Sequence, residues 1–188
     1  MNVLNLLKET NALLQGHFVL SSGLHSAKYI QCASVLKYPK YAEKLCKELA
    51  KKFKGVKVDA VIAPAIGGIL VSYELARALG VPSLFTERKD GQMLLRRNFK
   101  IAKGERLLVV EDVITTGGST KEVIDVVNSC GGEVVGVGCI IDRCGKKNIF
   151  GKIPLKSLQK ITVVTYPPDK CPLCKQGIPV DKPGSKQK

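Results

Sequence analysis

Two adjacent carboxylates and the turn that follows them are the residues of this chain best suited to chemistry. The carboxylates belong to Glu111 and Asp112, and the turn reads Thr115-Thr116-Gly117-Gly118-Ser119-Thr120. An apolar, β-branched run ends just before the two acids, and a helical pattern begins at Ser119. This order predicts negative charge at the carboxyl end of a buried strand, followed by free backbone N–H groups at the start of a helix.

Each half of this stretch suits a different part of one ligand. Unpaired N–H groups and the helix dipole both favour an anion such as phosphate at a helix N-terminus. Carboxylate oxygens suit the vicinal hydroxyls of a sugar, or a hydrated Mg²⁺ ion, because such cations prefer hard oxygen ligands. The stretch therefore predicts a site for a phosphorylated sugar.

Other phosphate or nucleophile motifs do not fit the spacing. A P-loop requires Gly-Lys-Ser/Thr, which is absent from the sequence, and a dinucleotide fingerprint requires Gly-x-Gly-x-x-Gly after the strand. A serine-nucleophile elbow requires a second glycine where Lys121 stands. The ordinary alternative is an acidic β–α turn in which Ser119 caps the helix and Glu122 completes a capping box.

The hydrophobic periodicities predict an α/β architecture. Leu4, Leu7 and Leu14 suggest an N-terminal helix, and residues 18–22 and 28–32 suggest a hairpin around Gly23. Further helices are expected at residues 39–53, 69–79 and 120–130, and strands at 58–63, 81–86, 106–111, 134–141 and 161–165. Alternating strands and helices imply a mainly parallel sheet that binds ligands at the carboxyl ends of its strands.

Three further segments fall at that edge of the predicted sheet. Residues 65–68 contain paired glycines, which let backbone approach a ligand closely, although such glycines also serve helix packing. Residues 87–99 carry several cations on a connection that is longer than needed, and could be either a solvated hairpin or a lid. The third segment, residues 141–143, ends a strand in Arg143, which could be a surface ion pair or a recognition group.

The motifs together resemble a known family. Residues 111–119 are similar to the phosphoribosyl-pyrophosphate (PRPP) signature of the type I phosphoribosyltransferases. Residues 16–23, with Ser26 and Tyr29, resemble the N-terminal hairpin of the orotate-specific members. Residues 141–143 and the tail around 171–174 are similar to one branch of those members, so that the resemblance extends from Leu13 to Gly184.

The resemblance implies a fold and an activity. We expect one domain over residues 1–188, with a central, mainly parallel sheet flanked by helices. Residues 1–35 would contribute to a small hood, residues 87–99 would form a mobile lid, and residues 179–188 would be a frayed tail. The activity would be Mg²⁺-dependent transfer of phosphoribosyl from PRPP to orotate, giving orotidine 5′-monophosphate and pyrophosphate in UMP biosynthesis. The family further implies a cytoplasmic homodimer whose lid is shared between subunits.

The resemblance also assigns roles to residues. The catalytic group would be Glu111, Asp112, Arg88 and Lys89. The residues binding PRPP would be Thr115, Thr116, Gly117, Gly118, Ser119, Thr120, Ala65, Ile66, Gly67, Gly68 and Arg96. The residues binding orotate would be Ser22, Tyr29, Ile30, Thr115 and Arg143. No protein side chain is expected to ligate the metal directly, because Mg²⁺ would be held mainly by PRPP and water.

The chain departs from the family pattern at several positions. Ile66 and Gly67 stand where many orotate enzymes carry an aromatic residue and a lysine, and Ser21 stands where many carry a lysine. The lid segment is shorter than usual and lacks a lysine and a histidine found in relatives. A cation that contacts pyrophosphate would therefore come from elsewhere, with Arg96 and Arg97 as candidates.

Composition limits the remaining functional classes. The formal net charge of +14 could indicate nucleic-acid binding, but the cations are spread along the chain and an anionic substrate also needs positive potential. No apolar run approaches the roughly 18 residues of a membrane span, and no export signal is evident. We therefore expect neither nucleic acid nor membrane as a partner. A phosphoribosyltransferase for another nucleobase, or a regulatory protein that binds PRPP, remain the alternatives.

The cysteines favour a reducing compartment and leave one question open. Seven cysteines, of which Cys46 and Cys139 lie in apolar patterns, argue against a disulfide framework. Cys171 and Cys174 form a single Cys-x-x-Cys pair, at most half of a zinc site, and reduced thiols in a tail turn are the simpler interpretation. A four-thiolate zinc bridging two subunits stays open. We expect His17 and His25 to be structural or surface residues.

Overall fold

The computed structural model describes residues 2–20, 22–145 and 149–183. Within it the chain forms two compact units. The smaller unit combines Met1–Val35 with Ile161–Lys188, and the larger is Leu36–Lys160. The smaller unit thus contains the segment 1–35 expected in a hood, and it adds the C-terminal segment, which the sequence patterns did not place there.

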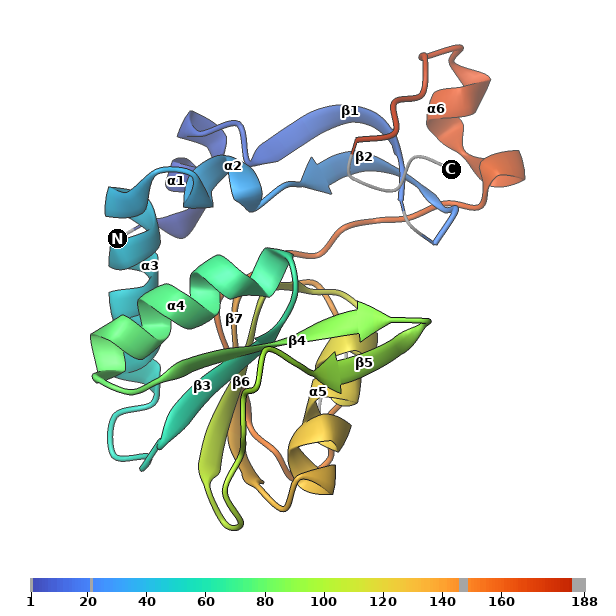
Figure 1. The fold of residues 1–188 in the computed structure, drawn as a ribbon. Coiled ribbons are helices and arrows are strands. Elements are labelled where there is room, and N and C mark those ends of the chain that lie inside the picture. The colour runs from blue at the N-terminus through green and yellow to red at the C-terminus, as the bar shows by residue number, and fades with distance from the viewer. Residues whose placement is uncertain (1, 21, 146–148, 184–188) are drawn as a thin grey trace. The chain divides into compact units, whose positions relative to one another are not determined.

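The larger unit is built on a six-stranded sheet in the order β5-β4-β3-β6-β7-β8 (Figure 1). All neighbouring strands are parallel except β4 and β5, which are antiparallel. The expected central, mainly parallel sheet is confirmed. The strands are β3 (Ala60–Pro64), β4 (Ser83–Lys89), β5 (Gln92–Leu95), β6 (Arg106–Ile114), β7 (Glu133–Asp142) and β8 (Leu155–Lys160).

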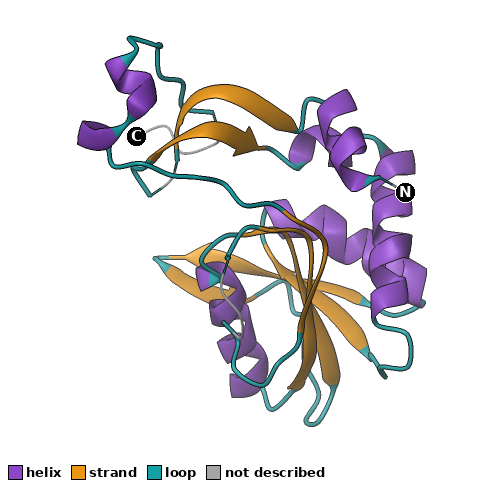
Figure 2. Cartoon of the chain, turned by 180° about the vertical axis from the view of Figure 1, so that it is seen from behind, coloured by secondary structure: helices purple, strands orange, loops and turns teal. Residues whose placement is uncertain are grey.

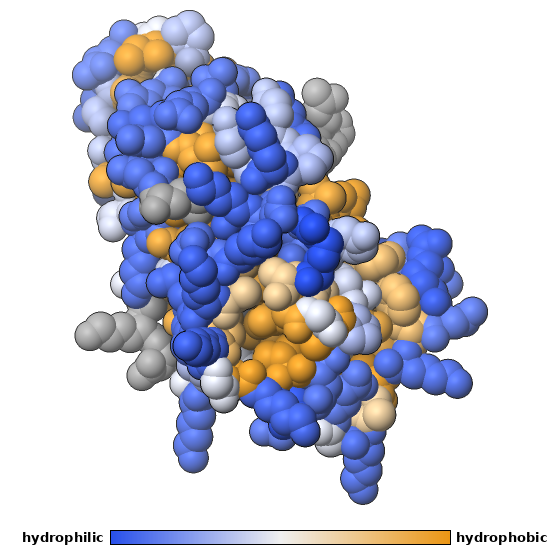
Figure 3. Space-filling view, turned by 90° about the vertical axis from the view of Figure 1, so that its left-hand side faces the viewer, coloured by the Kyte–Doolittle hydropathy of each residue, from blue (hydrophilic) through white to orange (hydrophobic). Residues whose placement is uncertain are grey.

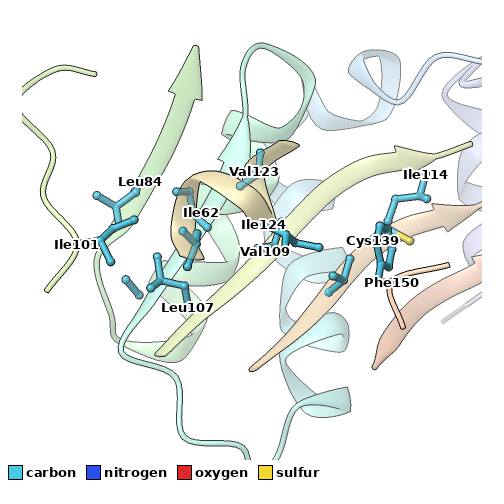
Figure 4. Packing of buried hydrophobic residues seen from close by; sticks show 13 residues of the cluster. Ile62, Leu84, Ile101, Leu107, Val109, Ile114, Val123, Ile124, Cys139 and Phe150 are labelled. Carbon is cyan, nitrogen blue, oxygen red and sulfur yellow. The ribbon is translucent and has the colours of Figure 1, made fainter. Parts of the chain in front are cut away.

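Helices cover both faces of this sheet because its central strands are apolar on both sides (Figure 2). On one face, Val123 and Ile124 of α5 (Gly118–Ser129) join Leu107 and Val109 of β6 in the core (Figure 4). The opposite face carries α3 (Pro39–Lys52) and α4 (Gly67–Leu79). There the glycines of β7 make room, because a Cβ atom on Gly136 would lie 2.9 Å from the ring of Phe53.

The smaller unit is an antiparallel hairpin to which the C-terminal segment is attached. It contains α1 (Val3–Glu9), β1 (Leu13–Val19), β2 (His25–Ile30), η1 (Pro168–Lys170) and α6 (Pro172–Lys175). The short α2 (Ala33–Leu36) lies at the boundary between the units. The C-terminal segment pairs with both strands, since Tyr166 bridges His25 and Asp181 bridges Phe18. Hydrophilic side chains cover most of the face in Figure 3, with apolar side chains exposed in several places among them.

Several element boundaries differ from the sequence-based expectations. Leu14 lies in β1, because α1 ends at Glu9 and Asn11 adopts a positive φ of 52°. The expected strand at 161–165 is wrong. The last strand is β8, whose register Val137↔Leu155 aligns it with β7, and the chain then leaves the larger unit. Pairing with a neighbouring strand thus overrides the higher β-propensity of the segment 161–165.

The segment expected as a lid includes a hairpin turn, and the segment expected as a frayed tail is hydrogen-bonded to β1. Residues 87–99 contain the β4–β5 hairpin, whose turn is Asp90-Gly91 with φ values of 51° and 81°, as a tight hairpin requires. In the tail, the carbonyl of Asp181 accepts a 2.8 Å hydrogen bond from the N–H group of Val19 on β1. Residues 184–188 lie outside the described residues.

Candidate functional site

The predicted ligand-binding edge coincides with the point where the strand order reverses. From β3 the chain moves to β4 on one side, and it later returns to place β6 on the other side of β3. In open α/β sheets a crevice forms at the carboxyl ends of the strands flanking such a point. Residues 65–68 follow β3 and residues 115–117 follow β6, so both predicted turns lie at this crevice.

The turn after β3 contacts the acidic pair of β6 closely. A Cβ atom on Gly67 would lie 3.1 Å from Oδ1 of Asp112, and one on Gly68 would lie 3.2 Å from Oε1 of Glu111 and 2.7 Å from Cβ of Ala63. Only glycine therefore fits at Gly68 without displacing its neighbours. The peptide between Ala65 and Ile66 is cis. Ile66 is 85% exposed, so this part of the turn is accessible to solvent.

The two carboxylates are half-buried at the end of β6, which continues through them to Ile114. Oε1 of Glu111 accepts the N–H of Asp112 at 3.1 Å, and Oδ1 of Asp112 accepts the N–H of Val113 at 2.7 Å. Burial, and then repulsion from Asp112, raise the pKa of Glu111 well above its usual value. Burial also raises the pKa of Asp112, although local hydrogen bonds oppose it. The site thus holds negative charge at a cost to the fold.

The turn after β6 ends in a left-handed residue and exposes its hydroxyl groups. Gly117 has φ 78° and precedes α5, so the helix begins at Gly118, and no side chain caps it. The alternative capping box at Ser119 and Glu122 does not form. The side chains of Thr115, Thr116 and Ser119 are exposed, whereas Thr120 is buried. Exposed hydroxyls and the first N–H groups of a helix are groups suited to bind an anion.

Arginines in and just after the β4–β5 hairpin form ion pairs. Arg88 pairs with Glu122 of α5, and its Nη1 donates to the carbonyl of Gly91 at 2.6 Å. Glu87 accepts two hydrogen bonds of 2.8 Å from Arg97, and Nη1 of Arg96 lies 3.8 Å from the same carboxylate. Because Glu122 is on α5, Arg88 lies beside the helix that follows the turn. Lys89 is exposed on the same hairpin.

Arg143 follows β7 and is anchored to the end of β6. Its backbone N–H donates to the carbonyl of Ile114 at 2.8 Å, and the residue is half-buried. The preceding Asp142 is buried, and it accepts a 2.9 Å hydrogen bond from the N–H of Cys144. The structure therefore brings the backbone of Arg143 next to the turn that starts at Thr115.

The remaining predicted residues lie in the smaller unit. Ser22 is exposed, and its Oγ accepts the N–H of Leu24 at 3.5 Å. Tyr29 is half-buried, with its ring centroid 5.8 Å from that of Phe18, and Ile30 is buried. Ser21 lies outside the described residues. The roles of these hairpin residues toward a base remain predictions.

His17 and His25 are not surface residues, because both are buried beside Cys171 and Cys174. The Cys-x-x-Cys pair gave no sign of this cluster, since the histidines lie about 150 positions away in sequence. A usable signal was that the only two histidines of the chain flank the hairpin turn.

Comparison with known proteins identifies the family of the site. The family model named phosphoribosyl transferase domain matches residues 34–148. A protein of Caldanaerobacter subterraneus subsp. tengcongensis, named orotate phosphoribosyltransferase, is 56% identical over 98% of this chain and 97% of its own length. A protein of the same name from Thermotoga maritima is 52% identical over 96% of each chain.

Solved structures of phosphoribosyltransferases are also similar to this chain. Orotate phosphoribosyltransferase from Aeropyrum pernix matches with a TM-score of 0.72 at 29% identity, over 85% of this chain and 94% of that one. Adenine phosphoribosyltransferase from Leishmania donovani matches with a TM-score of 0.65 at 17% identity, over 85% of this chain and 80% of that one. At this identity the match shows the shared fold alone. Among the described residues, no helix has the length and apolar character needed to cross a membrane.

The raised pKa of Glu111 predicts a pH-dependent cost. An acid whose pKa is raised in the folded state lowers the free energy of unfolding when it is ionised. This loss of stability is complete above the raised pKa and disappears as the pH falls toward the ordinary value of 4.5. Glu111→Gln should therefore raise the melting temperature of the ligand-free protein at about pH 8, with the gain shrinking to nothing near pH 4.5. Thermal unfolding followed by circular dichroism across this range measures the effect. The exposed Glu133→Gln is the control, and a gain independent of pH would contradict the prediction.

Proposed function

Because the chain belongs to the orotate phosphoribosyltransferase branch of the phosphoribosyltransferase family, we propose that it transfers ribose 5-phosphate from PRPP to N1 of orotate. The products are orotidine 5′-monophosphate and pyrophosphate, and the step belongs to the biosynthesis of UMP. The observation that carries this proposal is the identity of 52–57% to orotate phosphoribosyltransferases over nearly the whole chain. The PRPP-type turn at the crevice between β3 and β6 agrees with it.

The acidic pair is suited to the charge that develops during this reaction. Departure of pyrophosphate leaves positive charge on the ribose, as in glycosidic cleavage. Glu111 and Asp112 are half-buried carboxylates whose charged forms are disfavoured by burial. A cationic sugar offsets that cost more than a neutral sugar does. Stabilisation therefore grows toward the transition state, which is the requirement for catalysis.

Two glycine-containing turns would hold the 5′-phosphate and the pyrophosphate of PRPP. The turn from Thr115 to Thr120 would hold the 5′-phosphate, with its exposed hydroxyls and the first N–H groups of α5. The turn from Ala65 to Gly68 would hold pyrophosphate, because its paired glycines let a ligand approach the backbone closely. Arg88, Lys89 and Arg96 would add positive charge on the leaving side, and Arg88 would first exchange its pairing with Glu122 for the ligand.

The donor atoms of the crevice fit Mg²⁺. Two carboxylates and several hydroxyls supply hard oxygen atoms. Burial disfavours the charged forms of both carboxylates, and a hydrated cation nearby would offset that cost. The ion would be held mainly by PRPP and water, with Glu111 and Asp112 nearby. When bound it would neutralise charge on the leaving pyrophosphate.

Recognition of the base is assigned to Arg143 and to the hairpin residues. The planar guanidinium of Arg143 matches the carboxylate or O4 edge of orotate, and its backbone is fixed to the end of β6. Thr115 would contact the base from the phosphate turn. Ser22, Tyr29 and Ile30 of the hairpin would complete the orotate site.

A homodimer with a shared lid is part of the proposal. Ile66, which precedes α4, and Leu70 and Tyr73 of α4 are exposed apolar residues at helical spacing, with 85%, 48% and 61% of their surfaces accessible. Exposed apolar patches of this kind often mark protein interfaces. The β4–β5 hairpin projects its cations on exposed residues, as a lid that closes over a neighbouring active site requires.

Turnover of a panel of bases tests the proposed function. Purified protein is incubated with PRPP and Mg²⁺, and pyrophosphate release is measured with orotate, uracil, hypoxanthine, xanthine and adenine. Orotate alone should support turnover. Preference for another base would move the chain to a different phosphoribosyltransferase activity. PRPP binding without turnover of any base would favour a regulatory protein.

Neutralising the acidic pair should abolish most of the activity. The double variant Glu111→Gln with Asp112→Asn keeps the shape of both side chains and removes two charges that face a developing cation. We expect kcat to fall by at least about 100-fold, the scale of losing one well-placed electrostatic stabiliser. Circular dichroism serves as the control for folding, and near-normal kcat would exclude the assignment to the ribose.

Removing the Arg143 side chain should affect orotate more than PRPP. A ligand carboxylate that loses a desolvated partner typically loses about 2–4 kcal/mol of binding. Arg143→Ala should raise KM for orotate by the corresponding factor and leave PRPP binding nearly unchanged. Steady-state kinetics with each substrate varied separately checks this. Equal losses for both substrates would indicate a structural role.

The shared lid predicts complementation between inactive variants. A protein carrying Arg88→Ala and Lys89→Ala is mixed with an Asp112→Asn protein under conditions that allow subunits to exchange. If each lid serves the partner's site, a mixed dimer contains one intact site, and activity should recover to a measurable fraction of the wild-type value. Subunit exchange is verified by mass spectrometry. No recovery after verified exchange would mean that each lid serves its own chain.

A further inference from the structure

Four potential metal ligands gather in the smaller unit, and none of them is a residue assigned to the reaction. They are His17 and His25 of the hairpin and Cys171 and Cys174 of the C-terminal segment. One ligand atom from each lies within 4.8 Å of the others. His17, His25 and Cys171 are buried, with 3%, 8% and 0% of their surfaces exposed, whereas Cys174 is exposed.

The backbone of the smaller unit positions these four residues. His17 lies on β1 and His25 on β2, and the register Val19↔His25 places them on neighbouring strands. The C-terminal segment pairs with both histidines, since the N–H of Asp181 donates to the carbonyl of His17 at 2.7 Å and the N–H of His25 donates to the carbonyl of Tyr166 at 2.8 Å. Cys171 caps the short helix α6 and Cys174 lies within it, one helical turn later.

The distances between the ligand atoms resemble the edges of a tetrahedron around one ion. With Zn–S bonds of about 2.3 Å and Zn–N bonds of about 2.0–2.1 Å, a tetrahedral site separates nitrogen from sulfur by roughly 3.6 Å. The Sγ atom of Cys174 lies 3.3 Å from Nδ1 of His25 and 3.7 Å from Nε2 of His17. The Sγ atom of Cys171 lies 3.5 Å from Nε2 of His17.

One distance is too short for a metal-bound site and has a separate cause. Nε2 of His17 and Nδ1 of His25 are 2.8 Å apart, the length of a hydrogen bond between the two rings. Two nitrogens bound to one zinc would be about 3.4 Å apart, so a metal would replace this hydrogen bond and separate the rings by roughly 0.6 Å. Small movements of two side chains would accommodate it.

The tautomer of His17 is already set for a metal ligand. Its Nδ1 lies 2.8 Å from the carbonyl oxygen of Ile178. A carbonyl only accepts, so the proton is on Nδ1 and the lone pair of Nε2 is directed at the cluster. Histidine ligands of metals characteristically donate their second ring nitrogen to such a carbonyl or carboxylate. Ile178 belongs to the same C-terminal segment as the two thiols.

We propose that His17, His25, Cys171 and Cys174 form a structural Zn²⁺ site. Two thiolates and two imidazoles are a ligand set that selects zinc, and four protein ligands leave no open position for catalysis. The ion joins the hairpin to a C-terminal segment about 150 residues later in the chain, in a unit with few buried apolar residues. One chain supplies all four ligands, so no thiolate from a second subunit is needed.

Metal content and ligand geometry test the site directly. The full chain, purified without chelators or a histidine tag and dialysed, should contain about one zinc per chain by plasma mass spectrometry. Replacement by Co²⁺ should give the intense visible bands of tetrahedral cobalt, together with ultraviolet thiolate-to-cobalt charge transfer. An absence of zinc that persists after exposure to Zn²⁺, a six-coordinate cobalt spectrum, or a Cys171–Cys174 disulfide in the freshly isolated protein would each overturn the proposal.

A matched pair of variants separates zinc binding from folding. Cys174→Ser changes an exposed ligand, and Cys130→Ser changes an exposed cysteine of the larger unit. Zinc affinity, measured by competition with a chromophoric chelator, should fall more than about 100-fold in the first variant, beyond the usual loss from disturbing an outer hydrogen bond. It should be unchanged in the second. Equal affinity in both variants would overturn the assignment.

Thermal unfolding supplies a readout that does not depend on catalysis. A strong chelator should lower the melting temperature of the wild-type and Cys130→Ser proteins and have little effect on Cys174→Ser. The same chelator effect on all three proteins would contradict a stabilising ion at these residues. Because none of these measurements uses substrate, their outcome is independent of whether the protein acts on orotate.

Discussion

Negative charge held at the edge of a buried strand is the constraint on which the functional half of the molecule depends. Glu111 and Asp112 end an apolar strand in the centre of the sheet, where water is too scarce to solvate two carboxylates fully. A fold that keeps them there accepts a cost in stability, and perturbed groups of this kind are characteristic of active sites. The surrounding turns are shaped by the same pair. A Cβ atom on Gly67 would lie 3.1 Å from Oδ1 of Asp112, and one on Gly68 would lie 3.2 Å from Oε1 of Glu111 and 2.7 Å from Cβ of Ala63, so glycine suits both positions.

The larger unit carries most of the residues assigned to the reaction, and the smaller unit would add the orotate contacts Ser22, Tyr29 and Ile30. The larger unit brings the β3 turn, the β6 turn and Arg143 to one edge of the sheet by strand order alone. The smaller unit has a short hairpin and a C-terminal segment with little regular structure, so it buries less apolar surface. A metal ion that binds side chains from both segments would compensate for a small core, as it does in other small domains. The histidines and thiols would then matter for the stability of this unit and not for the transfer step.

Much of the larger unit could be predicted from sequence because its signals are local. Periodicity located α3, α4 and α5 to within a few residues, and the alternation of strands and helices predicted the mainly parallel sheet. The acidic pair and the glycine turns were identified from residue type and spacing. What failed were features set by distant pairing. The strand after residue 154 was placed too late, because its register depends on β7, and the hairpin form of residues 87–99 was only one of two interpretations. The buried cluster of His17 and Cys171 depends on contacts between the two ends of the chain, which leave no local pattern.

Binding of charged and neutral mimics of the sugar tests most directly whether the acidic pair serves a developing cation. A phosphorylated iminoribitol, whose ring nitrogen carries a positive charge, is compared with its neutral carbocyclic analogue by calorimetry in the presence of pyrophosphate. The wild-type protein should bind the cation at least about 100-fold more tightly, in the manner of a transition-state analogue. In the variant with Glu111→Gln and Asp112→Asn this preference should disappear, while affinity for the neutral analogue stays within a few fold. An undiminished preference in the variant would show that the positive charge is stabilised elsewhere and would contradict the account.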